Sequence, residues 1–128
     1  MPENKGVDSM LDQIIYSETE IIERLAYWQE KLRLRDWLVQ VHIKREKDFT
    51  QDNSNAYVHY NINNKSAFIT IMDPRDFDDW LPQDMEWLLV HELLHLHFAP
   101  MHTNKNEISI EQAIESITYG LVHLYRGR

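Results

Sequence analysis

The sequence has no cysteine, only 3 glycines and 4 prolines, and no long uninterrupted apolar run. Without cysteine the chain can form neither a disulfide nor a thiolate-bound zinc ribbon, which leaves His, Asp and Glu as its strong metal ligands. There is no internal repeat, low-complexity tract or Pro/Gly-rich linker that would separate two domains. We therefore expect residues 1–128 to form a single domain, with residues 1–8 as a flexible tail.

Two further absences limit the cellular setting and the class of partner. No stretch is as long and apolar as a membrane span, and the N-terminal residues lack the apolar core of a signal peptide. The formal net charge is −8, and the lysines and arginines that a nucleic-acid interface needs are gathered only in a short basic stretch over residues 31–47. We therefore expect a cytoplasmic protein that binds neither membrane nor nucleic acid.

The spacing of apolar residues predicts an α+β fold that begins with a helix. A capping-box pattern at Ser17 and Glu20, followed by helical spacing, predicts a helix that reaches about Leu34. Three runs rich in β-branched and apolar residues predict strands at Trp37–Ile43, Tyr57–Ile62 and Ala67–Met72. Asn63-Asn64-Lys65 predicts the turn of a hairpin, because Asn tolerates left-handed backbone conformations.

Two further helices are predicted after the strands. The first, over residues 84–98, is apolar on nearly all sides, as in a helix that is buried on most faces. The second runs from Glu107 to about Tyr125, and its predicted core stripe is Ile110, Ile114, Ile117, Leu121 and Leu124. The expected architecture is therefore one helix, a small, largely antiparallel sheet of three strands, and two packed helices.

The pentapeptide His91-Glu92-Leu93-Leu94-His95 lies inside the buried helix. Two histidines four residues apart share one helical face, so both imidazoles can bind one metal ion. Glu92 can then take a proton from a water molecule on that ion. In a chain of this composition the pattern is expected by chance only about 0.03 times. His91 and His95 are therefore candidate metal ligands, and Glu92 is the candidate general base.

A catalytic zinc usually has three protein ligands, so a third ligand must come from elsewhere in the chain. A short connection makes the last two helices an expected antiparallel pair. In such a pair Glu111 lies level with His95, and Glu115 lies level with His91. This favours Glu111 as the third ligand and Glu115 as the acceptor for the free ring N–H of a ligating histidine. The exchanged assignment, with Glu115 on the metal, is the main alternative.

His91-Glu92-Leu93-Leu94-His95 followed by Glu111-x-x-x-Glu115 resembles the gluzincin metallopeptidases, whose pattern is His-Glu-x-x-His and then Glu-x-x-x-Asp. The size and element order look similar to the minimal gluzincins and to ImmA/IrrE-type peptidases, several of which occur in phages and mobile elements. The resemblance covers roughly residues 56–128. It departs from the pattern at Glu115, where that group often has Asp or Asn, so the roles of the two glutamates stay open.

The resemblance implies a zincin-like core with one Zn²⁺ per chain and a cleft bordered by the strand Ala67–Met72, which could pair with an extended peptide. We expect a zinc-dependent endopeptidase in which the metal activates a water molecule and Glu92 passes its proton to the leaving amine. His102, Tyr119 and His123 are candidate donors to the oxyanion.

A peptide or protein substrate is the expected partner, together with a regulatory protein if the domain needs activation. One alternative is a zinc-containing regulatory or binding module with little activity of its own. A metal hydrolase of another kind, such as a three-histidine ribonuclease, would need a third histidine at the right spacing and a basic surface. The sequence has neither feature.

Overall fold

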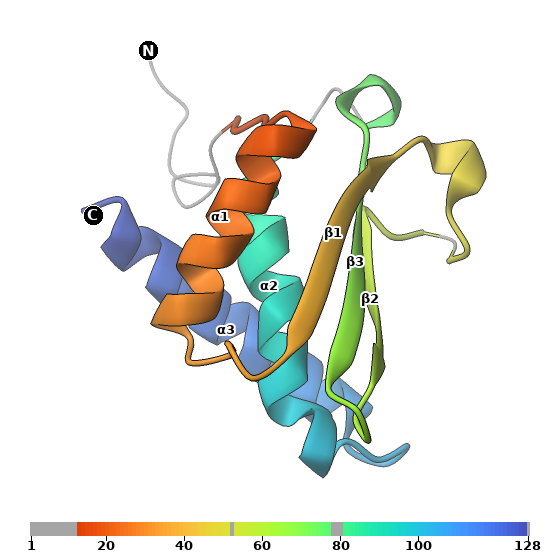
Figure 1. The fold of residues 1–128 in the computed structure, drawn as a ribbon, viewed down its shortest axis with the longest axis vertical. Helices are drawn as coiled ribbons and strands as arrows, with labels where there is room; N and C mark the ends of the chain where they lie inside the picture. Colours follow the sequence, from red (N-terminus) through yellow and green to blue (C-terminus); the bar gives the residue numbers. More distant parts are fainter. Residues whose placement is uncertain (1–12, 52, 78–80, 128) are drawn as a thin grey trace.

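The fold is described from a computed structural model, which covers residues 13–51, 53–77 and 81–127. The predicted tail over residues 1–8 lies outside these residues. The chain is α+β, with three α-helices and one sheet of three strands in the described part (Figure 1). No helix among these residues has both the length and the apolar character needed to cross a membrane.

The first helix, α1 (Glu18–Lys31), begins at the predicted capping box. The Ser17 hydroxyl accepts a hydrogen bond from the Glu20 backbone N–H at 3.1 Å, and the Glu20 carboxylate accepts one from the Ser17 N–H at 2.9 Å. These two bonds satisfy backbone donors that the first turn of a helix leaves unpaired. The prediction of the start of α1 is therefore confirmed.

The helix ends three residues before the predicted limit at Leu34. Arg33 takes a left-handed conformation with φ of 60°, its N–H bonds to the Glu30 carbonyl, and the Leu34 N–H reaches back to the Gln29 carbonyl at 2.8 Å. This is a Schellman C-cap in which Arg stands where Gly is usual. Leu34 is then buried as the hydrophobic residue that follows the cap, which explains why it fits the helical pattern without belonging to the helix.

The sheet is mixed, which corrects the prediction of a largely antiparallel sheet. Its order is β1 (Leu38–Lys44), β3 (Ser66–Met72), β2 (Ala56–Asn61); β3 pairs parallel with β1 and antiparallel with β2. The predicted hairpin between β2 and β3 is present. The long connection after β1 places β2 on the far side of β3, so the first and third strands become parallel neighbours.

The hairpin turn uses its asparagines differently from the prediction. The left-handed position is Lys65, with φ of 52°. The Asn61 side chain accepts hydrogen bonds from the backbone N–H groups of Asn63, at 2.9 Å, and Asn64, at 3.4 Å. Asparagine therefore stabilises this turn through its side chain, as in an Asx-turn.

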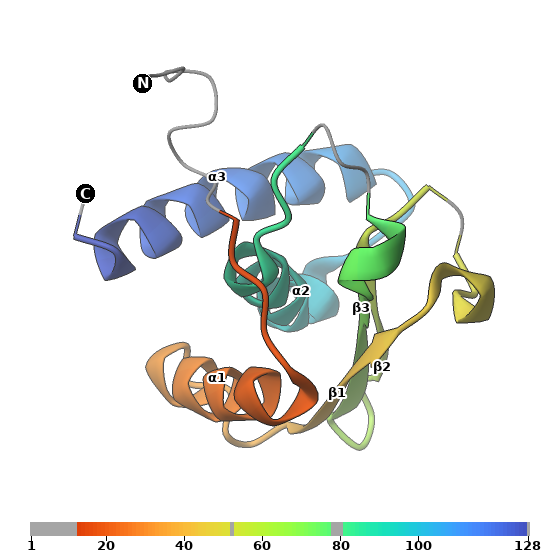
Figure 2. The same ribbon diagram turned by 90° about the horizontal axis from the view of Figure 1, so that it is seen from above.

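The helix α2 (Met85–Phe98) lies between α1 and α3 (Glu107–Tyr125) and against the sheet (Figure 2). Because other elements contact it on several sides, its buried residues lie all round the helix, as the sequence predicted. The short 3-10 helix Ala99–Met101 and a turn reverse the chain, and α3 runs back obliquely across α2 (Figure 1).

The oblique crossing changes the predicted core stripe of α3. Ile110 and Ile114 are buried as expected, but Ile117 is 39 % exposed and Leu124 is 75 % exposed. The buried face continues instead through Thr118 and Val122, so that successive buried residues are four apart. The N-terminal half of α3, which carries Glu111 and Glu115, is thereby held against α2.

Candidate metal centre

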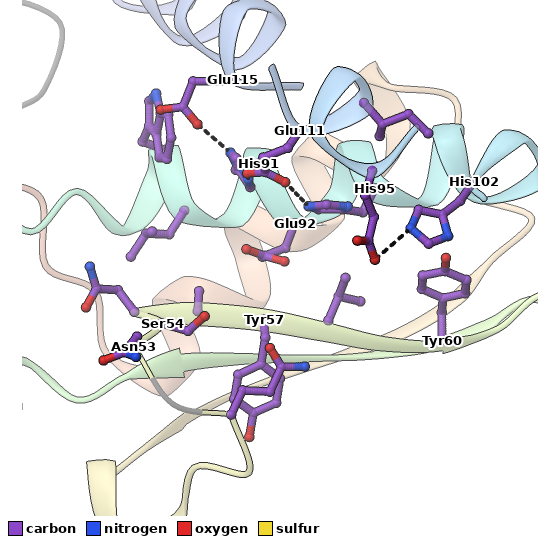
Figure 3. A pocket seen from close by; sticks show the side chains of 18 of the residues that line it. Asn53, Ser54, Tyr57, Tyr60, His91, Glu92, His95, His102, Glu111 and Glu115 are labelled. Atoms are coloured by element: carbon purple, nitrogen blue, oxygen red, sulfur yellow. Dashed lines mark ion pairs between the residues drawn. The ribbon is translucent and has the colours of Figure 1, made fainter. Parts of the chain in front are cut away.

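The candidate metal ligands come from two helices that pack against each other. His91 and His95 lie one turn apart on the face of α2 that meets α3, while Glu111 and Glu115 lie one turn apart on α3 (Figure 3). The turn after α2 reverses the chain, so the end of α2 lies beside the start of α3. This arrangement brings together four side chains that are up to 24 residues apart in the sequence.

The carboxylate of Glu111 lies between the two histidines. Its Oε2 atom is 2.8 Å from His91 Nε2, and its Oε1 atom is 3.3 Å from His95 Nε2. These residues form the one group of His, Asp and Glu within the described ranges whose ligand atoms all lie within 4.8 Å of one another. The structure therefore brings the three predicted ligands together.

The spacing of these atoms suits a small divalent cation. Ligand atoms at about 2.0–2.1 Å from a tetrahedral zinc lie about 3.3 Å from one another, which matches the contact of Glu111 with His95, whereas the contact with His91 is shorter at 2.8 Å. Two imidazole nitrogens with one carboxylate also form a donor set of the catalytic type, in which a fourth position is left for water. His and carboxylate ligands accept several divalent metals, so the donor set fits zinc without excluding others.

The second ring nitrogen of His91 supports this interpretation. His91 is 7 % exposed, and its Nδ1 atom is buried without a hydrogen bond to any described residue. The Oε1 atom of Glu115 lies 3.7 Å from this nitrogen, beyond hydrogen-bond distance. The indole of Trp87 packs against the imidazole with ring centroids 5.0 Å apart, so the ring plane is held between an aromatic neighbour and a carboxylate.

Glu92 lies beside the cluster and points into the space between α2 and β2 (Figure 3). It is 7 % exposed, and burial, with a smaller contribution from the nearby Glu111 carboxylate, raises its pKa to about 8. Burial also lowers the pKa of His95, which keeps that imidazole neutral and able to bind a metal. A divalent cation beside Glu92 would favour its ionised form and oppose the effect of burial.

These groups open onto a cleft of about 870 Å³. One wall is formed by α2 and the start of α3, and the other by β2 together with residues 51 and 53–55 before it (Figure 3). Ala56, Val58 and Tyr60 alternate along β2 on the cleft side, and His102 lies opposite Tyr60 at one end. The candidate metal ligands lie along the middle of this cleft.

The three candidate oxyanion donors have different positions. His102 lines the cleft, and its Nε2 atom is 3.4 Å from Glu107 Oε2. Tyr119 packs on Trp87 outside the cleft lining, and burial together with Glu115 raises the pKa of its hydroxyl. His123 is about one helical turn further along α3 than Tyr119 and is not part of the lining. Of the three, only His102 is beside the space where a substrate would lie.

The strand that borders the cleft differs from the prediction. Ala67–Met72 belongs to β3, which is the central strand and is paired on both sides, so it cannot pair with a peptide. The cleft is bordered instead by the edge strand β2. Tyr60 and Trp87 also line the cleft and were missed, although Trp87 precedes His91 by four residues and so shares its helical face.

Comparisons with known proteins give no assignment. No protein-family model, no curated protein and no solved structure matches this chain. The function must therefore be argued from the cleft and its side chains.

Proposed function

We propose that the protein is a zinc-dependent endopeptidase with a zincin-like core, as the resemblance to the small gluzincins implies. The observation that carries this proposal is the convergence of His91, His95 and Glu111 on one point, with the buried Glu92 carboxylate beside them in an open cleft. A structural metal site would not need an open cleft or a largely buried carboxylate that faces this cleft.

His91, His95 and Glu111 would hold the ion. When bound, zinc would act as a Lewis acid that makes a water molecule more acidic and polarises the scissile carbonyl. Glu92 would accept a proton from the attacking water and deliver it to the nitrogen of the leaving amine. Its buried position suits this role, because a carboxylate with little hydration is more basic than one in water.

The edge of β2 supplies hydrogen-bonding groups for a peptide backbone. Met72 donates its N–H to the Asn55 carbonyl. In an antiparallel pair every second residue forms backbone hydrogen bonds with the neighbouring strand, so along β2 the residues that bond to β3 are Tyr57, His59 and Asn61. The N–H and C=O groups of Ala56, Val58 and Tyr60 therefore point away from β3, toward the open edge. No strand among the described residues pairs along that edge, so an extended substrate could add to the sheet there.

His102 is the donor that we assign to the developing oxyanion. It lies in the cleft, and Glu107 stands 3.4 Å from its Nε2 atom. Its imidazole N–H can donate a hydrogen bond to a negatively charged oxygen. Tyr119 and His123 are not part of the proposed mechanism.

The first experiment measures metal and hydrolysis in the same preparations. Purified wild-type protein is expected to contain about one zinc per chain by elemental analysis and to hydrolyse a quenched fluorescent casein. Glu92→Gln should retain the zinc and lose at least about a thousandfold in rate, because the amide cannot accept the proton. His95→Ala should lose both zinc and activity.

Two results would contradict the proposal. A wild-type protein that binds no zinc when zinc is supplied would leave no metal site. Unchanged activity in Glu92→Gln would remove the proposed general base. Stoichiometric zinc without hydrolysis of casein or of any other peptide would favour the regulatory or binding module.

A further inference from the structure

The charge of the cleft lining is one-sided. Among the described residues that line it there are four glutamates and neither a lysine nor an arginine. Under the proposed function, Glu92 and Glu111 serve the metal centre. Glu107 and Glu115 lie one helical turn before and one turn after Glu111 on the same face of α3, and beside their contacts with His102 and His91 both keep exposed carboxylate surface. A cationic group near the metal centre would therefore meet a carboxylate at either end of the cleft.

The end of the cleft at Glu107 combines this charge with an apolar surface. The Glu107 side chain is 64 % exposed, and its contact with His102 leaves carboxylate surface open to solvent. Ile108 is 76 % exposed, and Tyr60 projects from β2 across the cleft toward His102 (Figure 3). The site thus offers an aliphatic side chain, an aromatic ring and a carboxylate within one recess. Lys and Arg side chains have matching parts, with an apolar stem and a charged head.

Glu92 gives a separate reason to expect a ligand in the cleft. It is 7 % exposed, points toward β2 and makes no hydrogen bond to any described residue (Figure 3). Its carboxylate oxygens are not among the fully buried unsatisfied atoms of the described residues, so they face the open cleft and are available to a bound group. The acidic residues around it therefore belong to a built cavity and are more than a solvated helix face.

We propose that this cleft selects peptides with Lys or Arg next to the scissile bond, with the cation held by Glu107 beside Tyr60. This inference rests on the proposed function, because it names the substrate class of the same site. Glu107 is about 6 Å from Glu111 along the axis of α3, which is about the reach of a lysine side chain from its backbone. The cation therefore belongs to a residue adjacent to the bond that is cut.

The test uses binding as well as cleavage. The binding probes are alanine-rich, fluorescein-labelled octapeptides that differ only at the fourth position, which is Lys, norleucine or Glu. Zinc-loaded Glu92→Gln protein should bind the Lys peptide about tenfold more tightly than the norleucine peptide, and the Glu peptide more weakly than either. A library of randomised decapeptides, digested by the wild type and analysed by mass spectrometry, should show Lys and Arg enriched beside the cleaved bond.

Glu107→Gln is the decisive variant, and Glu30→Gln is its matched control. Glu30 is an exposed glutamate on α1 that pairs with Arg35 and does not line the cleft. In the Glu92→Gln background, Glu107→Gln should reduce the Lys-to-norleucine ratio to about twofold or less, whereas Glu30→Gln should keep it. Thermal unfolding of each variant shows whether Glu107 acts only as a helix-start carboxylate, in which case stability changes and the ratio does not.

The outcomes separate this inference from the proposed function. Cleavage without enrichment of Lys or Arg, or a Lys-to-norleucine ratio near one, would overturn the inference and leave the peptidase in place. Selective binding of the Lys peptide that depends on Glu107, with no cleavage by the zinc-loaded wild type, would support the basic subsite and contradict the peptidase. A loss of cleavage in Glu107→Gln that is equal for all peptides would assign Glu107 to positioning His102 alone.

Discussion

Glu115 has a carboxylate oxygen 3.7 Å from Nδ1 of His91, the ring nitrogen that points away from the candidate metal position. The other nitrogen, Nε2, faces Glu111. A histidine that binds a metal through one nitrogen commonly donates its other N–H to a carboxylate, which fixes the tautomer and makes the ring a better ligand. At 3.7 Å the contact with Glu115 is too long for a hydrogen bond, so the contacts of Glu111 with both histidines carry its proposed role as the metal ligand. Glu115 is then the carboxylate placed to orient His91.

The two glutamates should therefore differ in their effect on metal binding. Glu111→Ala removes a ligand and should abolish stoichiometric zinc binding, whereas Glu115→Ala should weaken the affinity by about 10- to 100-fold. Glu115→Gln keeps an acceptor oxygen and should lie between Glu115→Ala and the wild type. Competition with a chromophoric zinc chelator measures all three variants. Greater loss in Glu115→Ala than in Glu111→Ala would exchange the two roles.

The buried Glu92 carboxyl predicts how the metal-free protein responds to pH. Its pKa of about 8 in the folded chain exceeds its ordinary value of 4.5, so between these pH values the folded state holds a proton that the unfolded state has released. Folding stability must then fall as the pH rises through this window. Above pH 7 the slope should be about 1 kcal/mol per pH unit, measured by urea unfolding with a chelator present.

The window above pH 7 separates Glu92 from His95. The pKa of His95 is lowered by burial, so its contribution increases with pH until the unfolded imidazole, with its ordinary pKa of 6.5, has lost its proton, and it is nearly complete by about pH 7.5. Glu92→Gln carries no titrating group at position 92 and should show a flatter profile between pH 7 and 8. Saturating zinc should also remove the decline in the wild type, because a nearby dication favours the ionised carboxylate. A wild-type decline that persists in Glu92→Gln would assign it to another group.

The open edge of β2 predicts a substitution that affects peptide binding more than folding. Val58→Pro removes an N–H that points away from β3, so the ladder between β2 and β3 should remain intact. Affinity for extended peptides should fall about 5- to 10-fold, by the loss of one backbone hydrogen bond. Fluorescence anisotropy on the Glu92→Gln background measures this effect.

Tyr57→Pro, which removes a bond to β3, is the contrasting variant and should instead destabilise the fold. Equal peptide affinity with and without Pro at position 58 would exclude pairing along β2.

The features that the sequence predicted well are local. The capping box at Ser17, the hairpin between β2 and β3, and the shared helical face of His91 and His95 each depend on spacings of a few residues. The meeting of Glu111 with both histidines also followed from local geometry, because a short reversal aligns the end of one helix with the start of the next.

The features that were missed depend on how distant segments pack. Nothing in the loop after β1 determines on which side of β3 the strand β2 will lie, so the mixed sheet and the cleft wall could not be derived. The exposure of Ile117 follows from the oblique crossing of α2 and α3, which periodicity alone does not give. The left-handed Arg33 has no local signal, because Gly or Asn is usual at that position.

The last prediction concerns an ion pair between the start of α2 and the end of α3, the two helices that form the site. Arg126, after the end of α3, forms a two-point ion pair with Asp84, the N-cap of α2, with contacts of 2.7 Å and 2.8 Å. Their side chains are 11 % and 3 % exposed, so removing the cation leaves a buried carboxylate. Arg126→Met should therefore lower the free energy of unfolding by about 3 kcal/mol, measured by urea unfolding.

The double variant separates the ion pair from the packing of the arginine stem. Arg126→Met with Asp84→Asn also removes the buried negative charge and keeps an N-cap side chain, so it should recover at least half of the lost stability. Zinc affinity should change little in either variant, because the pair lies at the opposite end of α2 from His95. If Arg126→Met weakens zinc binding without lowering stability, then the pair sets the relative position of α2 and α3 instead of supporting the fold.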